Sequence, residues 1–183
     1  TVSGLNKWLH QHQFSYKQPK GVPHKFDVDK QAAFIEHYEQ LKASLNESEP
    51  LLFMDAVHPT QATKITSGWI KKGVDKLIKT TGSRTRLNIV GAIRLGHLDE
   101  AVIEQYDKTV NGESIVDFLT KTRNVYSSSG TIHLVLDGAG YHRSGLVIEA
   151  AKELDITLHY LPPYSPNLNP IERLWKVMNK HAR

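Results

Sequence analysis

Runs of apolar residues separated by polar or glycine-containing breaks predict the elements of this chain. Two short uninterrupted runs, 51–54 and 131–136, are typical of strands buried in a sheet. Further strands are expected at 67–72, 75–79, 87–95, 101–106 and 156–161. The short spacings between the first four of these favour antiparallel hairpins. Apolar positions at helical spacing predict helices over 2–13, 27–45, 112–126 and 143–154, and a last helix that begins near 170.

The order of these elements predicts an α/β fold, with one mixed sheet flanked by helices. Short hairpin connections come first, and helices then alternate with the later strands. In sheets of this kind, functional sites gather where strands end and loops begin. The residues that follow the two buried runs are therefore the first place to look for chemistry.

The last helix is preceded by a proline-rich loop at 161–170 that stiffens the approach to it. Asn169 suits the N-cap, Pro170 the first helical position and Glu172 the third. An apolar stripe at helical spacing follows: Ile171, Leu174, Trp175 and Met178. Glu172 is thus presented at the first turn of a packed helix. On local sequence alone, the Asn-x-x-Glu pair can equally be a capping box with no further role.

Composition narrows the class of protein. The 183 residues suffice for one domain with a substantial core. No run approaches the roughly 20 apolar residues of a membrane span, and no signal peptide opens the chain, so an intracellular protein without a membrane partner is expected. The absence of cysteine excludes disulfides, thiolate zinc sites and a cysteine nucleophile.

The net charge of +4 is unevenly distributed. Residues 59–88 hold seven Lys or Arg against one Asp, and residues 1–30 hold five Lys against two Asp. Concentrated positive charge indicates a polyanion partner such as nucleic acid, although a solvated lysine-rich surface would look the same. Residues 14–26 form a basic, Pro- and Gly-containing linker, which could also follow a DNA minor groove.

Three acidic residues are the candidate chemistry. Asp55 and Asp137 each follow an apolar run directly, and Glu172 arrives from the last helix. Each aspartate taken singly could be a turn residue at a strand end. If the two strands are neighbours, however, three carboxylates meet, and their repulsion requires raised pKa values or a divalent cation. Oxygen ligands indicate Mg²⁺ or Mn²⁺, and a two-metal site of this kind cleaves or transfers phosphodiesters.

Three segments together resemble the DDE transposases, in particular the bacterial insertion-sequence branch of the mariner superfamily. They are 52–55, 134–142 and the proline-rich stretch 161–175, and 34 residues separate Asp137 from Glu172. The resemblance implies a ribonuclease-H-like catalytic domain over 27–183, in which Asp55, Asp137 and Glu172 bind two Mg²⁺ or Mn²⁺ ions. Gly138 departs from the pattern, which usually has Asn after the second Asp.

The resemblance also implies an activity and partners. The enzyme would cut double-stranded DNA at transposon ends and join the 3′-OH to a target, usually at TA. Residues 1–13 resemble the last helix of a helix-turn-helix region that binds terminal inverted repeats, followed by the linker 14–26. A homodimer on DNA, associated with the nucleoid in the bacterial cytoplasm, is expected. A nuclease of the same fold without strand transfer, or a DNA-binding derivative with inactive carboxylates, are the alternatives.

Two groups of residues could support the acidic triad. His142 could reach a phosphate or a metal, or could only be a hydrogen-bonded loop residue, and Asn169 could orient Glu172. The basic residues expected to contact DNA lie in the linker, the 59–88 segment and the last helix: Lys17, Lys20, Lys64, Lys71, Lys72, Lys76, Arg84, Arg86, Arg173 and Lys176.

Overall fold

The computed structural model describes residues 1–16, 27–60, 67–73, 75–79 and 86–181. The strands of this part of the chain are β1 (Leu51–Val57), β2 (Asn88–Arg94), β3 (His97–Tyr106), β4 (Ile132–Leu136) and β5 (Ile156–Tyr160). The α-helices are α1 (Val2–Gln11), α2 (Val28–Ser44), α3 (Gly112–Val125), α4 (Gly145–Glu153) and α5 (Ile171–His181). Two 3₁₀ turns, η1 (Gly140–Arg143) and η2 (Pro166–Leu168), precede α4 and α5.

The strands form one mixed sheet in the order β3-β2-β1-β4-β5. The pairs β1–β2 and β2–β3 are antiparallel, whereas β1–β4 and β4–β5 are parallel. Gly96, in the turn between β2 and β3, has a φ of 85°, a conformation that glycine adopts without steric penalty. The parallel pair β4–β5 instead needs a longer crossover, and η1 with α4 supplies it. The mixed α/β sheet expected from the sequence is confirmed.

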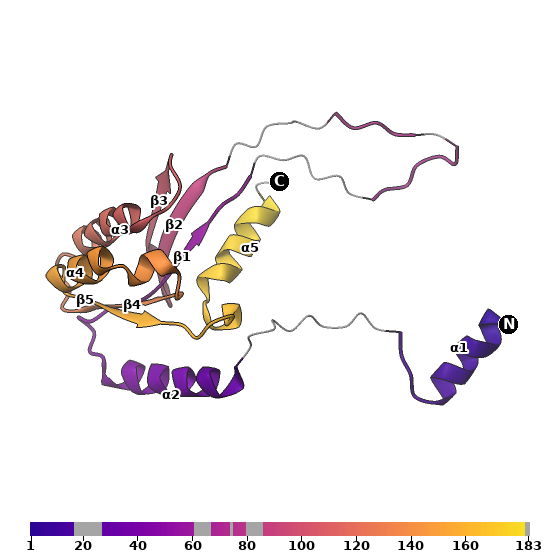
Figure 1. Cartoon of the computed structure of the whole chain (residues 1–183), viewed down its shortest axis with the longest axis horizontal. Coiled ribbons are helices and arrows are strands. Elements are labelled where there is room, and N and C mark those ends of the chain that lie inside the picture. The colour runs from indigo at the N-terminus through magenta and orange to yellow at the C-terminus, as the bar shows by residue number, and fades with distance from the viewer. Residues whose placement is uncertain (17–26, 61–66, 74, 80–85, 182–183) are drawn as a thin grey trace.

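Helices cover both faces of the sheet (Figure 1). On one face, even-numbered residues of β1 such as Leu52 and Met54 belong to a core shared with α3 and α4. The opposite face packs against α5 and one side of α2, through Phe53, Ile93, Val135, Ile171, Trp175, Phe34 and Tyr38. Because side chains alternate along a strand, Asp55 lies on the same face as Phe53, the face that α5 covers.

The N-terminal helix α1 has a different character, since it buries none of its residues. Leu5 and Trp8 are 60% and 51% exposed, so the apolar face that the sequence predicts is not covered within the described chain. Figure 1 shows α1 apart from the sheet. Within the described ranges, every helix is too short or too polar to cross a lipid bilayer.

Three sequence-based expectations about strands were wrong. Residues 67–72 and 75–79 form no strand in the described chain, and their large apolar side chains, such as Trp69 and Leu77, are almost fully exposed. Short apolar stretches among lysines and glycines have strand-like composition, but in the described chain their apolar side chains stay exposed and they pair with no strand. The first strand also does not end at Asp55: β1 continues to Val57, because it pairs with β2 up to that residue.

Candidate active site

The parallel pairing of β1 and β4 brings Asp55 and Asp137 together. Phe53 is opposite Val135, so the same register extended by two residues places Asp137 beside Asp55. Asp137 directly follows the last residue of β4, as the sequence predicts. Two residues beyond Phe53 and Val135, both carboxylates lie on the face covered by α5. Asp55 is therefore a residue inside a strand, while Asp137 lies at a strand end.

Helix α5 delivers Glu172, its second residue, to the same place. Ile171 and Trp175 are buried, and the helix approaches β2 closely because residue 91 is glycine. A Cβ at Gly91 would lie 2.7 Å from Trp175 Cη2. Gly91 is also the β2 partner of Asp55 in the sheet. The close contact between Trp175 and Gly91 thus sets the height of Glu172 above the strand that carries Asp55.

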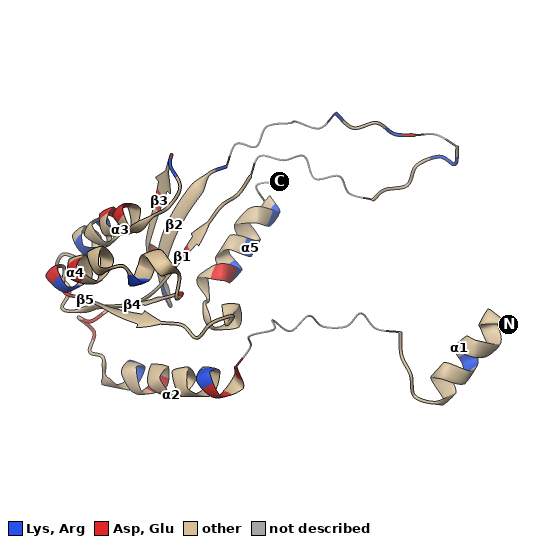
Figure 2. Cartoon of the chain, viewed as in Figure 1, with Lys and Arg blue, Asp and Glu red and all other residues tan. Residues whose placement is uncertain are grey.

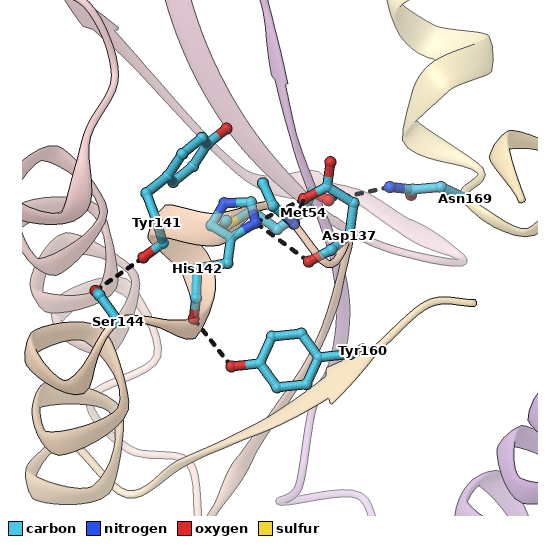
Figure 3. Close-up of polar contacts among 8 residues, drawn as sticks. Met54, Asp137, Tyr141, His142, Ser144, Tyr160 and Asn169 are labelled. Atoms are coloured by element: carbon cyan, nitrogen blue, oxygen red, sulfur yellow. Dashed lines mark hydrogen bonds and ion pairs between the residues drawn. The ribbon is translucent and has the colours of Figure 1, made fainter. Parts of the chain in front are cut away.

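Asn169 connects this helix start to β1, but not in the way expected. Its side-chain Nδ2 donates a 3.0 Å hydrogen bond to the backbone carbonyl of Met54, the residue before Asp55 (Figure 3). The helix begins at Ile171, and the backbone carbonyl of Asn169 accepts from the Glu172 N–H at 3.2 Å. The expected side-chain capping box was wrong. The buried Asn169 side chain instead ties the start of α5 to β1.

The three carboxylates line one pocket of about 650 Å³ at the ends of β1 and β4. The proline-rich loop forms one wall of it, and residues that follow β4 form another. Its lining includes Asp55, Asp137, Gly138, Ala139, Arg143, Leu161, Pro162, Pro163, Tyr164, Ser165, Pro166, Asn169 and Glu172. The arrangement leaves room at the carboxylates for a substrate the size of a phosphodiester.

The carboxylates influence one another's protonation. Burial, with added repulsion from Glu172 and Asp137, raises the pKa of Asp55 to about 7. Burial also raises the pKa of Glu172; Lys176 opposes this effect and Asp137 adds to it. In contrast, the hydrogen bond from His142 lowers the pKa of Asp137. An ionised Asp137 thus lies near an Asp55 that titrates close to neutrality, and such separated pKa values are typical of functional sites.

His142 is held against Asp137 (Figure 3). Its Nδ1 lies 2.6 Å from Asp137 Oδ1, and its backbone carbonyl accepts a 2.9 Å hydrogen bond from the Tyr160 hydroxyl. The ring is buried, with 1% exposed. In this position His142 orients the Asp137 carboxylate and does not itself line the pocket.

Polar atoms without partners gather around this site. In the described chain, three buried side-chain atoms lack a hydrogen bond: His142 Nε2, Asn169 Oδ1 and Trp175 Nε1. The Trp175 indole is nevertheless near enough to Asp55 to lower the pKa of that carboxyl slightly. Native proteins usually satisfy such groups with water or a ligand. Their concentration here indicates a site built for something more than the protein's own side chains.

The donor set suits a hard divalent cation. Carboxylate oxygens dominate the pocket, and the unpaired Asn169 Oδ1 belongs to a residue of its wall. Mg²⁺ and Mn²⁺ prefer such ligands. As they stand, no three His, Asp or Glu side chains among the described residues are arranged so that they could hold one ion. The residues therefore fit a metal in chemistry, and joint coordination would require side-chain rotation.

The candidate DNA-binding residues are scattered. Lys71, Lys72, Lys76 and Arg86 are exposed, and Figure 2 shows Lys residues of the 67–79 segment away from the sheet. Arg173 and Lys176 are exposed on α5, the helix that carries Glu172. Lys17, Lys20, Lys64 and Arg84 lie outside the described residues, as does most of the linker.

Two residues of the pocket were not singled out from the sequence. Arg143, at the end of η1, lines the pocket with the carboxylates. Tyr164 also lines it and has a φ of 57°, an unusual conformation for a bulky residue that often marks a functional loop. Arg143 could have been considered from the sequence because it lies six residues after Asp137. No local sequence pattern predicts the positive φ of Tyr164.

Two known protein families match parts of this chain. The family described as "DDE superfamily endonuclease" matches residues 50–183, and "Winged helix-turn helix" matches residues 1–38. The chain is 26% identical over 158 residues to the "Insertion element IS630 uncharacterized 39 kDa protein" of Shigella sonnei, covering 86% of this chain and 44% of that protein.

Solved structures show the same fold. A "Mos1 transposase paired-end complex with left transposon end" has a TM-score of 0.74 at 14% identity, covering 98% of this chain and 56% of that one. A "Mos1 mariner paired end complex with Mn" has a TM-score of 0.71, also at 14% identity, covering 100% and 57%. The chain thus spans about half the length of these relatives. The ribonuclease-H-like fold expected from the resemblance is confirmed, as is the insertion-sequence and mariner branch. With a family match over residues 50–183, the chain belongs to the DDE superfamily endonucleases.

Proposed function

We propose that this chain is the catalytic part of a transposase that cuts DNA at transposon ends and joins the resulting 3′-OH to target DNA. The observation that carries the proposal is the meeting of Asp55, Asp137 and Glu172 in one pocket, from three distant parts of the sequence. Asp137 adds to the raised pKa values of Asp55 and Glu172, so the three charges together are unfavourable for stability. A catalytic role explains why they share one pocket.

The metal would be held by these three carboxylates, as two Mg²⁺ or Mn²⁺ ions. When bound, divalent cations supply Lewis acidity at the attacking and leaving oxygens of a phosphodiester. Asp137 is prepared for this role, since His142 keeps it ionised and oriented. Positive charge in the pocket would favour the ionised forms of Asp55 and Glu172, which burial disfavours.

The protein's own groups would position the reaction. Asn169 fixes the start of α5 to the strand of Asp55, and the contact of Trp175 with Gly91 holds α5 against β2. The substrate would be double-stranded DNA, with exposed cations such as Lys71, Lys72, Lys76, Arg86, Arg173 and Lys176 on its phosphates. Positioning of the scissile phosphodiester by rigid elements supplies much of the rate in such chemistry.

The remaining parts extend the proposal to the whole protein. Residues 1–13 would be the end of a helix-turn-helix region that binds terminal inverted repeats, and 14–26 a basic linker to the catalytic domain at 27–183. The winged helix-turn-helix match supports a DNA-binding role at this end of the chain. Two copies would act as a homodimer on the bacterial nucleoid, because two transposon ends must be joined to one target, usually at TA.

Strand transfer with pre-cut DNA ends tests the function. With Mg²⁺ or Mn²⁺, wild-type protein should nick DNA and join a 3′-OH end to a second duplex. Asp137→Asn should reduce both reactions by at least about 100-fold while DNA affinity is kept. Glu149→Gln, which removes an exposed carboxylate on α4, is the matched control and should leave both unchanged. Cutting without joining would indicate a nuclease, and binding without turnover an inactive derivative; either would refute the transposase.

A further inference from the structure

Arg143 is the one basic side chain among the described residues that line the carboxylate pocket. It ends η1, which begins three residues after Asp137 and leads into α4. Its side chain is exposed, so it faces the pocket and not the core. A guanidinium beside three acidic groups would be expected to pair with one of them. In the part of the chain that the structure describes, it forms no ion pair and donates no hydrogen bond.

The guanidinium instead stacks on an aromatic ring that is itself held in place. Its Cζ lies 4.4 Å from the centroid of the Tyr160 ring, a cation–π distance. The Tyr160 hydroxyl donates to the His142 carbonyl at 2.9 Å, which fixes the ring beside η1 (Figure 3). Stacking on an aromatic ring leaves the N–H donors of an arginine available at its edge. The side chain is therefore positioned, and its hydrogen-bonding capacity is unused.

Gly138 makes room for this arrangement. A Cβ at residue 138 would lie 3.2 Å from Arg143 Nη2 and 3.4 Å from Nε. To admit even a methyl group at residue 138, the guanidinium would have to shift by a few tenths of an ångström. The glycine that departs from the usual pattern after the second aspartate is thus coupled to the arginine. The guanidinium of Arg143 occupies the space that a side chain at residue 138 would enter.

We propose that Arg143 is a phosphodiester-binding residue of this pocket and holds a non-bridging oxygen of the DNA phosphate beside the carboxylates. The proposal rests on the proposed function for its substrate class. A phosphodiester is repelled by three carboxylates, and a planar guanidinium with unused donors is the group best suited to hold it. Gly138 and Tyr160 position the residue, while Arg143 itself touches the substrate.

Side-chain NMR of Arg143 tests this contact directly. The Nε–Hε signal of Arg143, assigned by its loss in Arg143→Lys, is followed while a short DNA duplex is added to the 183-residue chain. The signal should shift and saturate with the DNA. Arg143→Gln should weaken the affinity about tenfold, as expected for one charge-assisted contact, and Arg143→Lys should restore part of it. Lys152→Gln, on the exposed side of α4, should change the affinity less than twofold.

Gly138→Ala gives a second, milder variant that keeps every charge. It should weaken DNA binding less than Arg143→Gln, and it should have no further effect in the Arg143→Gln background. An Arg143 signal that stays fixed at saturating DNA, or an Arg143→Gln affinity equal to that of Lys152→Gln, would overturn the proposal. Plasmid nicking separates the two claims. If DNA shifts the Arg143 signal but wild-type protein does not nick plasmid, the phosphate contact of Arg143 is supported and the proposed transposase function is refuted. If wild type and Arg143→Gln nick plasmid equally, the phosphate contact is refuted and the enzymatic function is supported.

Discussion

Asn169 carries the side chain whose role changed most between sequence and structure. As an expected N-cap it would stabilise one helix, but its amide instead donates to the Met54 carbonyl, 115 positions away. That bond joins the strand of Asp55 to the helix of Glu172. A capping residue and a residue that bridges two elements have the same local sequence, because only the tertiary partner distinguishes them.

Asn169→Asp should therefore destabilise the protein more than a surface substitution would. The change replaces the Nδ2 donor by an oxygen that faces a buried carbonyl, and it adds a fourth acidic group to the pocket wall. A loss of about 1–3 kcal/mol in the free energy of unfolding is expected, measured by urea denaturation. Gln105→Glu, the same change of amide to acid at an exposed residue of β3, should cost less than about 0.5 kcal/mol. Equal losses for the two variants would refute the bridging role.

The residue types of the site were predictable, but their surroundings were not. The apolar runs before Asp55 and Asp137 and the proline-rich loop before Glu172 made these three residues predictable. Arg143 has no such context, since its significance depends on a ring at Tyr160 and on space at Gly138. Contacts between residues that are far apart in sequence leave no periodic trace, so they become visible only when the chain is folded.

Among the elements, α5 depends on one glycine in the neighbouring strand. Gly91→Ala would place a methyl group 2.7 Å from Trp175 Cη2, so the helix must shift or the ring must rotate. Overpacking of this kind should cost about 1–3 kcal/mol in the free energy of unfolding and displace Glu172. Trp175→Phe should remove much of that clash. In a double-mutant cycle the two changes should couple by at least about 1 kcal/mol; purely additive costs would contradict this packing.

Helix α2 contacts the sheet through a chain of histidines. His37 Nε2 lies 3.1 Å from His159 Nδ1, and His159 Nε2 lies 3.0 Å from His133 Nδ1. Burial, with repulsion from His133 and His37, lowers the pKa of His159 to about 4, and burial lowers the pKa of His133. A neutral imidazole has one N–H donor and one acceptor nitrogen, so neutral rings can hydrogen-bond to each other, whereas two charged rings repel. The domain thus favours the uncharged forms of His133 and His159.

Acid should therefore weaken the folded state through His159. Between about pH 4 and 6.5 the unfolded chain binds a proton at this residue that the folded chain excludes, so stability rises with pH across that window. The destabilisation by His159 is complete below its pKa in the folded chain and absent above its pKa in the unfolded chain. His159→Gln should flatten the dependence of the melting temperature on pH relative to wild type. Other titrating groups are common to both proteins, so parallel curves would refute the role of His159.

Element prediction succeeded where packing enforces the pattern. The strands near 131–136 and 156–161 and the helices at 27–45 and 112–126 were found close to their expected limits, because each buries one face in a core. The expected strands at 67–72 and 75–79 failed because strand propensity has no effect without a neighbouring strand to pair with. Asp55 was expected at a strand end, yet pairing with β2 carries the strand two residues further.

At the scale of the whole molecule, the positive charge of the 67–79 segment lies away from the sheet that carries the acidic pocket. Lys71, Lys72 and Lys76 are exposed on the 67–79 segment, and Figure 2 shows no acidic cluster beside them in the described chain. If these lysines contact DNA phosphates, a variant with all three changed to Gln should release fewer counterions. The slope of log affinity against log salt should decrease in magnitude by about 2–3. An unchanged slope would mean that this segment is only a solvated surface.

The central claim is that Asp55, Asp137 and Glu172 together form one site for divalent cations. Mn²⁺ binding measured by electron paramagnetic resonance tests it most directly, because the signal of bound Mn²⁺ differs from that of the aqueous ion and no DNA is required. Wild-type protein and the Glu149→Gln control should bind Mn²⁺ alike, whereas Asp137→Asn should weaken binding at least about tenfold. Equal Mn²⁺ affinity in wild type and Asp137→Asn would contradict the account.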